Sequence, residues 1–317
     1  MHWAGSHHQL RKLQSRLSLV QGASGKCGGA YLYSNQRGCD GNRLYFDGRS
    51  DYIHPVYLCR DHSMCYCCYY CCYYYYSLSS SLICLNGSLL CQGSQFGLRD
   101  VEVLSALVDL DDVRAFRNKS ASVQEQSSAA AAARVYPIID LRHFSLAGSG
   151  HGSRPATSPV AVSLHSAEEE CCLGPACWLW DYLRRSGASG YLLPLSGGAD
   201  SAAVAGIVKV MCDLVVSEVG KGNKEVAADA LRIVNGSADA SAAAPDALAI
   251  SADSLCNALL HTVYMSTENS SQNTRSRASR IAGSIGAFHS ALAIDLIISV
   301  QHLPAKIASS SSASSLR

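Results

Sequence analysis

The stretch YLLPLSGGADSAAVAG, residues 191–206, decides the fold of the second half of the chain. Its first five residues are mostly apolar and predict a strand, and the Ala/Val/Ile-rich run after the glycines predicts a helix that stops near Gly220. A strand that turns through glycines into a helix is typical of the ligand-binding edge of a parallel sheet. We therefore expect a ligand site at residues 196–201.

The composition of this turn points to phosphate. Gly197 and Gly198 let backbone N–H groups approach an anion, and the helix that follows presents its free N–H groups to the same anion. Ser196 and Ser201 can donate hydroxyls to phosphate oxygens, whereas Asp200 suits the Mg²⁺ that accompanies a phosphate. The Walker Gly-Lys-Ser/Thr pattern is absent. The alternative is a plain strand–turn–helix with an Asp or Ser cap.

The residues around the turn alternate between helix and strand. We expect a helix over 174–187 with Pro175 near its start, and a stripe of Ala203, Ile207, Met211 and Leu214 on the helix after the turn. Further segments predict a helix (224–234), a second strand (255–265), a helix (270–286) and a third strand (288–294). Strands separated by helices indicate an α/β fold with a doubly wound parallel sheet.

The first half is predicted to be a β-rich piece of an α/β domain. Its segments read as a helix with Leu10, Leu13, Leu17 and Val20 on one face (5–24), a buried strand (28–35), a loop with a hairpin edge (36–48), a hairpin around Asn86-Gly87 (82–96), and a strand that turns into a helix (101–117). Residues 120–167 are predicted to be a linker, and the Ser-rich residues 301–317 a disordered tail.

Composition narrows the class of protein. The net charge of +1 gives no basic field for nucleic acid, and the N-terminus lacks a signal-peptide pattern, so we expect a cytoplasmic protein with free thiols.

The cysteines are unevenly distributed. Seven of the 15 lie between Cys59 and Cys84, around a Cys/Tyr/Ser tract at 64–81. One reading of this tract is a membrane span over 64–85, and another is a zinc site at Cys65, Cys67, Cys68, Cys71 and Cys72. We favour translated non-coding sequence, because zinc-finger spacing is missing and the Ser run lowers hydropathy.

Longer motifs resemble a known family. SGGADS, residues 196–201, resembles the pyrophosphatase loop of the N-type ATP pyrophosphatases. Its context at 168–201 and the segment YMSTENSSQNTRSRA at 264–278 resemble glutamine-dependent NAD⁺ synthetase. Segments 5–12, 27–48, 86–104 and 165–170 resemble the nitrilase-like glutaminase domain that precedes the synthetase in this family.

The resemblance implies an architecture and a chemistry. It implies part of a nitrilase-like α-β-β-α domain at 1–119 with a low-complexity insertion at 49–83, a linker, part of an adenine nucleotide alpha hydrolase-like synthetase domain at 168–300, and a tail. Family members release ammonia from glutamine through a Glu–Lys–Cys triad. They use ATP and Mg²⁺ to adenylate the nicotinate carboxylate of deamido-NAD⁺, which ammonia then converts to the amide. Full-length members are expected to be homo-oligomeric, with no nucleic-acid or membrane partner.

The resemblance also assigns residues. Ser196 is the catalytic residue of the synthetase site, and Asp200 is the Mg²⁺ ligand. The ATP site comprises Pro194, Leu195, Ser196, Gly197, Gly198, Ala199, Asp200, Ser201, Tyr264, Met265, Ser266 and Arg277. Arg277 reads equally as a solvated helix charge. Ser6, Arg11 and Lys12 are candidates for the glutamine pocket.

Part of the family pattern is missing. The family's nucleophilic cysteine lies in a Cys-Glu-Glu string that this sequence lacks, and Cys39 matches a loop cysteine that is not the nucleophile. We therefore expect an inactive fragment of a glutamine-dependent NAD⁺ synthetase, with no glutaminase nucleophile. A different hypothesis is a non-catalytic nucleotide-binding or interaction protein that retains the loop. Another amidotransferase or thiolating enzyme with the same loop is disfavoured by the context at 174–187.

Overall fold

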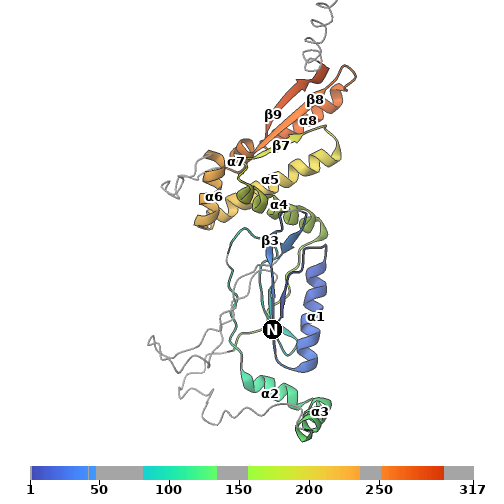
Figure 1. Ribbon diagram of the computed structural model, residues 1–317, viewed down its shortest axis with the longest axis vertical. Coiled ribbons are helices and arrows are strands. Elements are labelled where there is room, and N and C mark those ends of the chain that lie inside the picture. Colours follow the sequence, from blue (N-terminus) through green and yellow to red (C-terminus); the bar gives the residue numbers. More distant parts are fainter. Residues whose placement is uncertain are drawn as a thin grey trace, which may run out of the picture. The chain divides into compact units, whose positions relative to one another are not determined.

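The computed structural model describes residues 2–41, 43–47, 81–100, 102–133, 156–235 and 251–295 (Figure 1). The chain forms two compact units, Met1–Gly174 and Pro175–Arg317. Residues 64–80 of the Cys/Tyr/Ser tract, with its five candidate zinc ligands, lie outside the described residues, as do the predicted tail and the part of the predicted linker at 134–155, so the expectations for these segments remain predictions.

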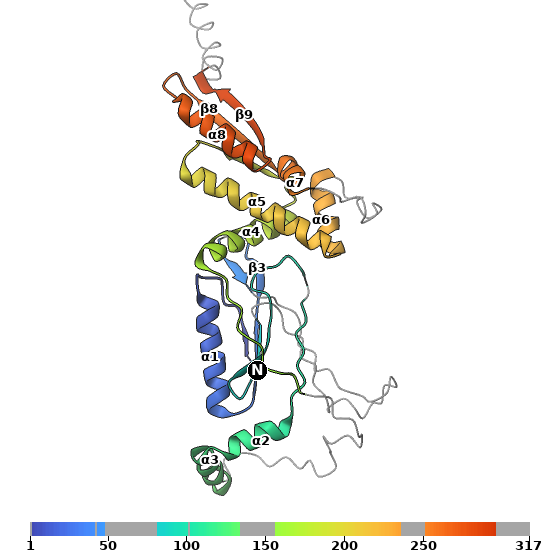
Figure 2. The same cartoon turned by 180° about the vertical axis from the view of Figure 1, so that it is seen from behind.

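The first unit is built on a four-stranded mixed sheet with a helix along it (Figures 1 and 2). Its strands, in sheet order, are β1 (His2–Ala4), β2 (Ala30–Asn35), β5 (Leu82–Leu85) and β6 (Ser88–Gln92). β1 and β2 are parallel, and the other pairs are antiparallel. A separate antiparallel pair, β3 (Arg37–Cys39) and β4 (Tyr45–Asp47), confirms the hairpin edge predicted there. Cys39, the last residue of β3, is buried.

The helix α1 (Lys12–Cys27) covers the sheet with the predicted apolar face. Leu13, Leu17 and Val20 are buried, and Leu17 and Val20 pack in a core with strand residues Tyr33, Leu82, Cys84 and Leu89. The prediction was wrong for Leu10, which is exposed. Arg11 has a left-handed backbone (φ 60°) that begins the helix one residue later, so Leu10 precedes the helix and its apolar stripe.

The hairpin predicted around Asn86-Gly87 is confirmed. Both residues have positive φ, 50° and 88°, as the tight two-residue turn between antiparallel strands requires. The Asn86 side chain also accepts a hydrogen bond from Gly29 N–H at 2.9 Å, so the turn is joined to the start of β2. This hairpin supplies two of the four strands in the sheet.

The strand predicted before residue 110 is wrong for the described residues 102–109, which form no strand. Leu107 is instead paired with the irregular segment at Thr157, whose hydroxyl accepts Leu107 N–H at 2.8 Å and whose N–H donates to Leu107 O at 2.9 Å. These two bonds satisfy the backbone N–H and C=O groups of Leu107 without a neighbouring strand. The helix predicted next is confirmed as α2 (Leu110–Asn118), capped by Asp109, and α3 (Ala121–Ala132) follows.

The second unit confirms the predicted α/β architecture. Three parallel strands lie in the order β7 (Tyr191–Pro194), β8 (Leu260–Ser266) and β9 (Phe288–Ala293). The intervening helices are α5 (Ala199–Gly220), α6 (Lys224–Asn235), α7 (Ala252–Leu259) and α8 (Gln272–Ser284). The strand predicted over 255–265 begins only at Leu260, because residues 255–259 form the end of α7. None of the described helices combines the length and apolar character needed to cross a membrane.

The helix predicted over 174–187 is longer than expected. It is α4 (Ala167–Ser186), which contains the division between the units and has Pro175 in its interior rather than near its start. The N-terminal signal lies upstream: Ser166 Oγ accepts Glu169 N–H at 3.2 Å, and Glu169 Oε2 accepts Ser166 N–H at 2.8 Å. This reciprocal capping box starts the helix early enough to place the proline inside it.

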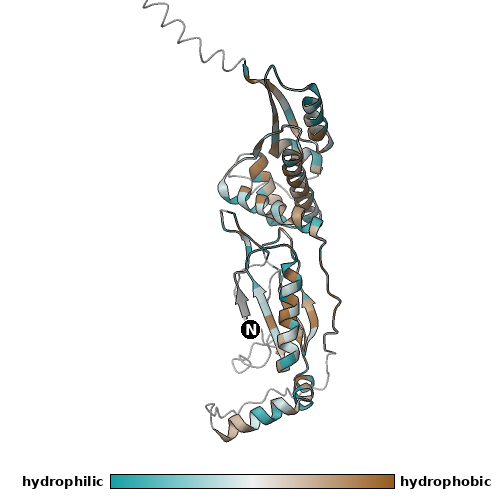
Figure 3. Cartoon of the chain, turned by 90° about the vertical axis from the view of Figure 1, so that its right-hand side faces the viewer, coloured by the Kyte–Doolittle hydropathy of each residue, from teal (hydrophilic) through white to brown (hydrophobic). Residues whose placement is uncertain are grey.

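The stripe predicted on α5 was also wrong, except for Met211. Ala203 is exposed and Ile207 and Leu214 are half-buried, whereas the buried apolar positions are Ala205, Val208, Met211, Cys212 and Val215. Figure 3 shows why spacing misleads: α5 is hydrophobic over most of its length. A helix that is apolar on several faces does not reveal its buried side by periodicity.

Candidate functional site

The glycine-rich turn begins where β7 ends, at the carboxyl edge of the parallel sheet. Leu195 is fully buried, and its N–H donates to Val263 O on β8 at 2.8 Å. This bond extends the strand pairing by one residue beyond Pro194. Ser196, the next residue, is exposed. The apolar strand therefore fixes the point from which the polar turn leaves the sheet.

Gly197 holds the turn against α8. Its φ is +77°, which side-chain-bearing residues rarely adopt, and a Cβ at this position would lie only 2.4 Å from Thr274 O. The same Cβ would lie 3.3 Å from Ala278 N. Glycine is required here both by backbone conformation and by close approach to another helix. This is the physical reason for the first glycine of the pair.

The turn then feeds directly into the N-terminus of α5. Gly198 is the N-cap residue and supplies no side chain, so the first N–H groups of the helix, beginning at Ala199, are not capped by one. Ser196 and Ser201 hydroxyls lie 3.0 Å apart, and Gly198 N–H donates to Ser196 Oγ at 3.3 Å. Two hydroxyls and a positive helix end thus gather at one place, an arrangement suited to an anion.

Asp200 is exposed in the first turn of α5. Among the described residues, no group of three or more His, Cys, Asp or Glu side chains could hold a metal ion. A lone carboxylate beside a phosphate-binding turn fits Mg²⁺, which is commonly held by one or two carboxylates together with phosphate oxygens and water.

The second predicted ATP segment lies on β8 and α8. Tyr264 is buried, and its hydroxyl lies 2.7 Å from Thr274 Oγ1. Because Thr274 O faces Gly197, Tyr264 helps to hold the helix against which the turn packs. Met265 is partly exposed, Ser266 Oγ donates to Leu292 O at 3.3 Å, and Arg277 is exposed on α8.

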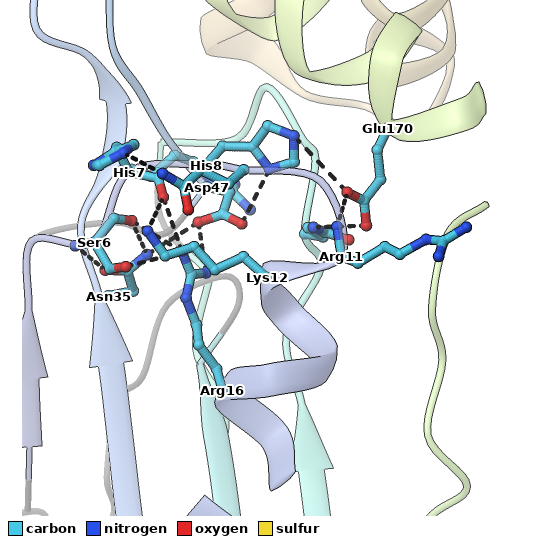
Figure 4. A network of polar contacts seen from close by, with 12 residues as sticks. Ser6, His7, His8, Arg11, Lys12, Arg16, Asn35, Asp47 and Glu170 are labelled. Atoms are coloured by element: carbon cyan, nitrogen blue, oxygen red, sulfur yellow. Dashed lines mark hydrogen bonds and ion pairs between the residues drawn. The ribbon is translucent and has the colours of Figure 1, made fainter. Parts of the chain in front are cut away.

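The candidate glutamine residues of the first unit lie around one polar network (Figure 4). Ser6 N–H donates to Asn35 Oδ1 at 2.8 Å, and Lys12 Nζ donates to His7 O at 3.1 Å. Arg11 N–H donates to Glu170 Oε2 at 2.8 Å. Burial, together with the nearby Arg16 charge, lowers the pKa of Lys12. The three predicted residues are thus close in sequence and share one network.

At the centre of this network lies Asp47, which is fully buried (Figure 4). Arg16 Nη1 donates to Asp47 Oδ1 at 2.7 Å, Asn35 Nδ2 donates to the same oxygen at 3.1 Å, and His8 Nδ1 lies 3.5 Å from Oδ2. Burial alone would raise the pKa of Asp47, but the bond with His8 and the charge and bond of Arg16 outweigh it and lower the pKa.

Arg16 also fixes the segment that carries Ser6. Its Nη2 donates to Ser6 O at 3.1 Å, to Ser6 Oγ at 3.2 Å and to His7 O at 3.2 Å. One guanidinium therefore joins the buried carboxylate to the backbone of the candidate glutamine segment.

Sequence reasoning missed Arg16, Asn35 and Asp47 as members of this network. The one available signal was the position of Arg16, which is buried on the apolar face of α1, three residues after Leu13 and four before Val20. A charged residue at such a position needs a buried partner of opposite charge. The sequence alone does not say which carboxylate supplies it.

Together these features define a two-unit α/β protein with a candidate phosphate-binding turn in its second unit. No protein-family profile matches the chain. It is, however, 45% identical over 296 residues to a glutamine-dependent NAD(+) synthetase of Oryza sativa subsp. indica, covering 93% of this chain and 35% of that protein. Similar enzymes of Arabidopsis thaliana and Saccharomyces cerevisiae are 43% and 41% identical, over 94% and 93% of this chain and 35% and 36% of theirs.

Solved structures agree in fold. A glutamine-dependent NAD(+) synthetase from Cytophaga hutchinsonii has a TM-score of 0.58 at 20% identity, covering 96% of this chain and 37% of its own. One from Acinetobacter baumannii, solved in complex with adenosine diphosphate, has a TM-score of 0.50 at 16% identity, covering 94% and 34%. The chain is thus similar over nearly all its length to glutamine-dependent NAD(+) synthetases, of which it spans about a third.

Proposed function

We propose that the second unit is the ATP-binding part of a glutamine-dependent NAD⁺ synthetase. The observation that carries this proposal is the turn at 196–201, where Gly197 packs against α8 and Gly198 opens the N-terminus of α5. The curated relatives bear that enzyme's name, and the Acinetobacter structure was solved with adenosine diphosphate. Both support a nucleotide as the anion that this turn accommodates.

In the proposed reaction, residues 194–201 bind and orient the phosphates of ATP. The N–H groups at the start of α5 and the hydroxyls of Ser196 and Ser201 stabilise the negative charge that builds on the departing pyrophosphate. Asp200 would hold Mg²⁺, which supplies charge neutralisation of the phosphates. Tyr264, Met265 and Ser266 border the adenosine, and Arg277 contributes a positive charge from α8.

The substrate half of the reaction follows from carboxylate chemistry. A carboxylate resists attack by ammonia until an oxygen is converted to a leaving group, so AMP is first transferred to the nicotinate carboxylate of deamido-NAD⁺. Ammonia then attacks the acyl carbon, AMP leaves, and the amide forms. The first unit would serve the supply of ammonia, with Ser6, Arg11 and Lys12 near the glutamine.

This chain itself is proposed to be inactive in both half-reactions. Its sequence contains no Cys-Glu-Glu string for the glutaminase nucleophile, and it spans 35% of the length of its plant relatives. A cytoplasmic location and homo-oligomeric full-length relatives belong to the same proposal. The competing possibility is a non-catalytic protein that uses the turn only to bind nucleotide.

Two assays on the purified chain test this proposal. Isothermal titration with ATP and Mg²⁺ should give saturable binding that the double variant Ser196→Ala/Ser201→Ala weakens at least tenfold. Ser217→Ala, an exposed serine on the same helix, should bind like the parent. A coupled assay with deamido-NAD⁺, ATP and ammonia should yield no NAD⁺. Equal binding by all three proteins would refute the site, and NAD⁺ formation would refute inactivity.

A further inference from the structure

Two consecutive residues of β8, Val263 and Tyr264, are connected to the glycine-rich turn from two sides. Val263 O accepts the N–H of Leu195, the residue before the turn, at 2.8 Å. Tyr264 reaches the turn indirectly, through α8, which packs along β8 (Figures 1 and 2). The first connection is made by the backbone and extends the strand pairing, whereas the second depends on side-chain hydroxyls.

The hydroxyls of Tyr264 and Thr274 form a chain of hydrogen bonds with a definite direction. Thr274 Oγ1 donates to Ser271 O at 2.7 Å, because a carbonyl oxygen can only accept. A threonine hydroxyl has a single proton, so Thr274 must accept at its 2.7 Å contact with the Tyr264 hydroxyl. Tyr264 therefore donates to Thr274, and Thr274 donates to Ser271, the N-cap residue of α8. We call these two bonds the hydroxyl chain.

The hydroxyl chain is partly shielded from water. Tyr264 is only 5% exposed, and Thr274 is half-buried. When one partner of such a bond is removed, the other is left without a partner in a place where water replaces it poorly. The hydroxyl of Tyr264 is thus used inside the unit, where it holds the first turn of α8 against the sheet.

The same turn of α8 lies against the glycine-rich turn. Thr274 carries both contacts: its hydroxyl belongs to the hydroxyl chain, and its carbonyl oxygen lies so close to Gly197 that a Cβ there would be 2.4 Å away. A shift of Thr274 would therefore change the space that Gly197 occupies. Since Gly198 follows directly and opens α5, the position of the first N–H groups of α5 depends on this contact.

We propose that Tyr264 and Thr274 are positioning residues for the phosphate-binding turn. The hydroxyl chain holds the first turn of α8, and α8 holds Gly197 at the distance that directs the N–H groups of α5 toward the anion. The inference rests on the proposed function for the identity of that anion, the phosphates of ATP. It gives a role to Thr274, which the sequence did not single out, and it makes the Tyr264 hydroxyl act through α8.

Four variants of the full chain test the proposal. Tyr264→Phe and Thr274→Val each remove one hydroxyl, whereas Thr274→Ser keeps it and Ser279→Ala removes an exposed hydroxyl from the same helix. In amide hydrogen exchange without ligand, the first two variants should exchange faster than the parent at residues 196–199, and the two controls should match it. Circular dichroism checks the fold, and Tyr264→Phe, which removes a single oxygen atom, is decisive if Thr274→Val does not fold.

The affinity for ATP with Mg²⁺ is the readout that a merely structural role would not change. Each variant without a hydroxyl should bind ATP about fivefold more weakly than the parent, which is the effect of roughly one hydrogen bond. The double variant Tyr264→Phe/Thr274→Val should bind no more weakly than Thr274→Val alone, because that substitution already breaks the bond between the two residues. Thr274→Ser and Ser279→Ala should keep the affinity of the parent.

Three results separate this proposal from the proposed function. Unchanged exchange at 196–199 in both variants without a hydroxyl would overturn the positioning role. Unchanged ATP affinity in these variants would also overturn it, and the proposed function would stand if Ser196→Ala/Ser201→Ala still weakened binding. A parent chain that binds no ATP would refute the proposed function, and exchange of the unliganded chain would then decide by itself whether the hydroxyl chain holds the turn.

Discussion

At the scale of single residues, Gly197 and Asp47 show two ways in which one position determines its surroundings. At position 197 the backbone restricts the residue type to glycine, since its positive φ and its approach to Thr274 O exclude a side chain. Asp47 is fixed by its charge, since a buried carboxylate needs the Arg16 guanidinium beside it. The first was recognisable in the sequence as part of a glycine pair. The second was not, because its partners Asn35 and Arg16 come from other segments.

Gly197→Ala should destabilise the second unit. The substitution combines a strained φ with a clash against Thr274 O, so we expect a loss of about 1–3 kcal/mol in the free energy of unfolding. Gly206→Ala is the matched control, because Gly206 lies inside α5 with open space around it and alanine should stabilise that helix by about 0.5–1 kcal/mol. Urea unfolding of both variants measures the difference. A neutral Gly197→Ala would mean that the turn does not need this glycine.

Asp47→Asn should destabilise the first unit. It leaves Arg16 buried without its carboxylate, and breaking a buried ion pair costs about 3–5 kcal/mol. Asp111→Asn is the control, because the Asp111–Arg114 pair is largely exposed and should contribute less than about 1 kcal/mol. Denaturant unfolding followed by circular dichroism compares them. Similar losses of unfolding free energy in the two variants would show that the buried network contributes no more stability than an exposed ion pair.

The same carboxylate predicts a pH dependence with a definite sign. The pKa of Asp47 is lowered from its ordinary value of 3.8, so the folded first unit binds this proton less readily than the unfolded chain does. The stability that it contributes is present above pH 3.8 and is lost as the pH falls through the lower, folded pKa. Asp47→Asn should lack this part of the acid transition. Parallel acid-unfolding curves for parent and variant would contradict the prediction.

At the scale of elements, local chemistry made some predictions reliable and tertiary contacts decided the rest. Asn86-Gly87 specifies its hairpin by itself, since both residues accept positive φ. The prediction of a strand before α2 was wrong because the hydrogen-bond partner of Leu107 is Thr157, 50 residues away, which local spacing does not reveal. The prediction of the buried stripe on α5 was wrong because the helix carries apolar residues on several sides, so the sequence does not show which side is buried. Local sequence signals predict an element reliably only where the residues of that one segment determine its conformation.

The capping box at the start of α4 gives a prediction at this scale. Ser166→Ala removes the hydroxyl that accepts Glu169 N–H and should cost about 1 kcal/mol in the free energy of unfolding. Ser166→Asp retains an oxygen acceptor at the N-cap and should stay close to the parent. Thermal unfolding of the three proteins distinguishes them. Equal melting temperatures for the alanine and aspartate variants would show that the cap does not contribute.

At the scale of the whole molecule, the sequence indicated the two α/β halves, the parallel sheet and the family relationship, because long motifs survive in order along the chain. It did not indicate the network around Asp47, which needs residues from α1, β2 and β4 to meet. Properties that arise when distant segments come together need the structure.

The central claim is that the backbone at the start of α5 binds phosphate. Amide hydrogen exchange of the full chain, with and without ATP and Mg²⁺, tests it most directly because it reports on the N–H groups themselves. We predict slower exchange at residues 198–202 and near Tyr264, with no change in α1 of the first unit. Unchanged exchange at 198–202 under saturating ATP would contradict it.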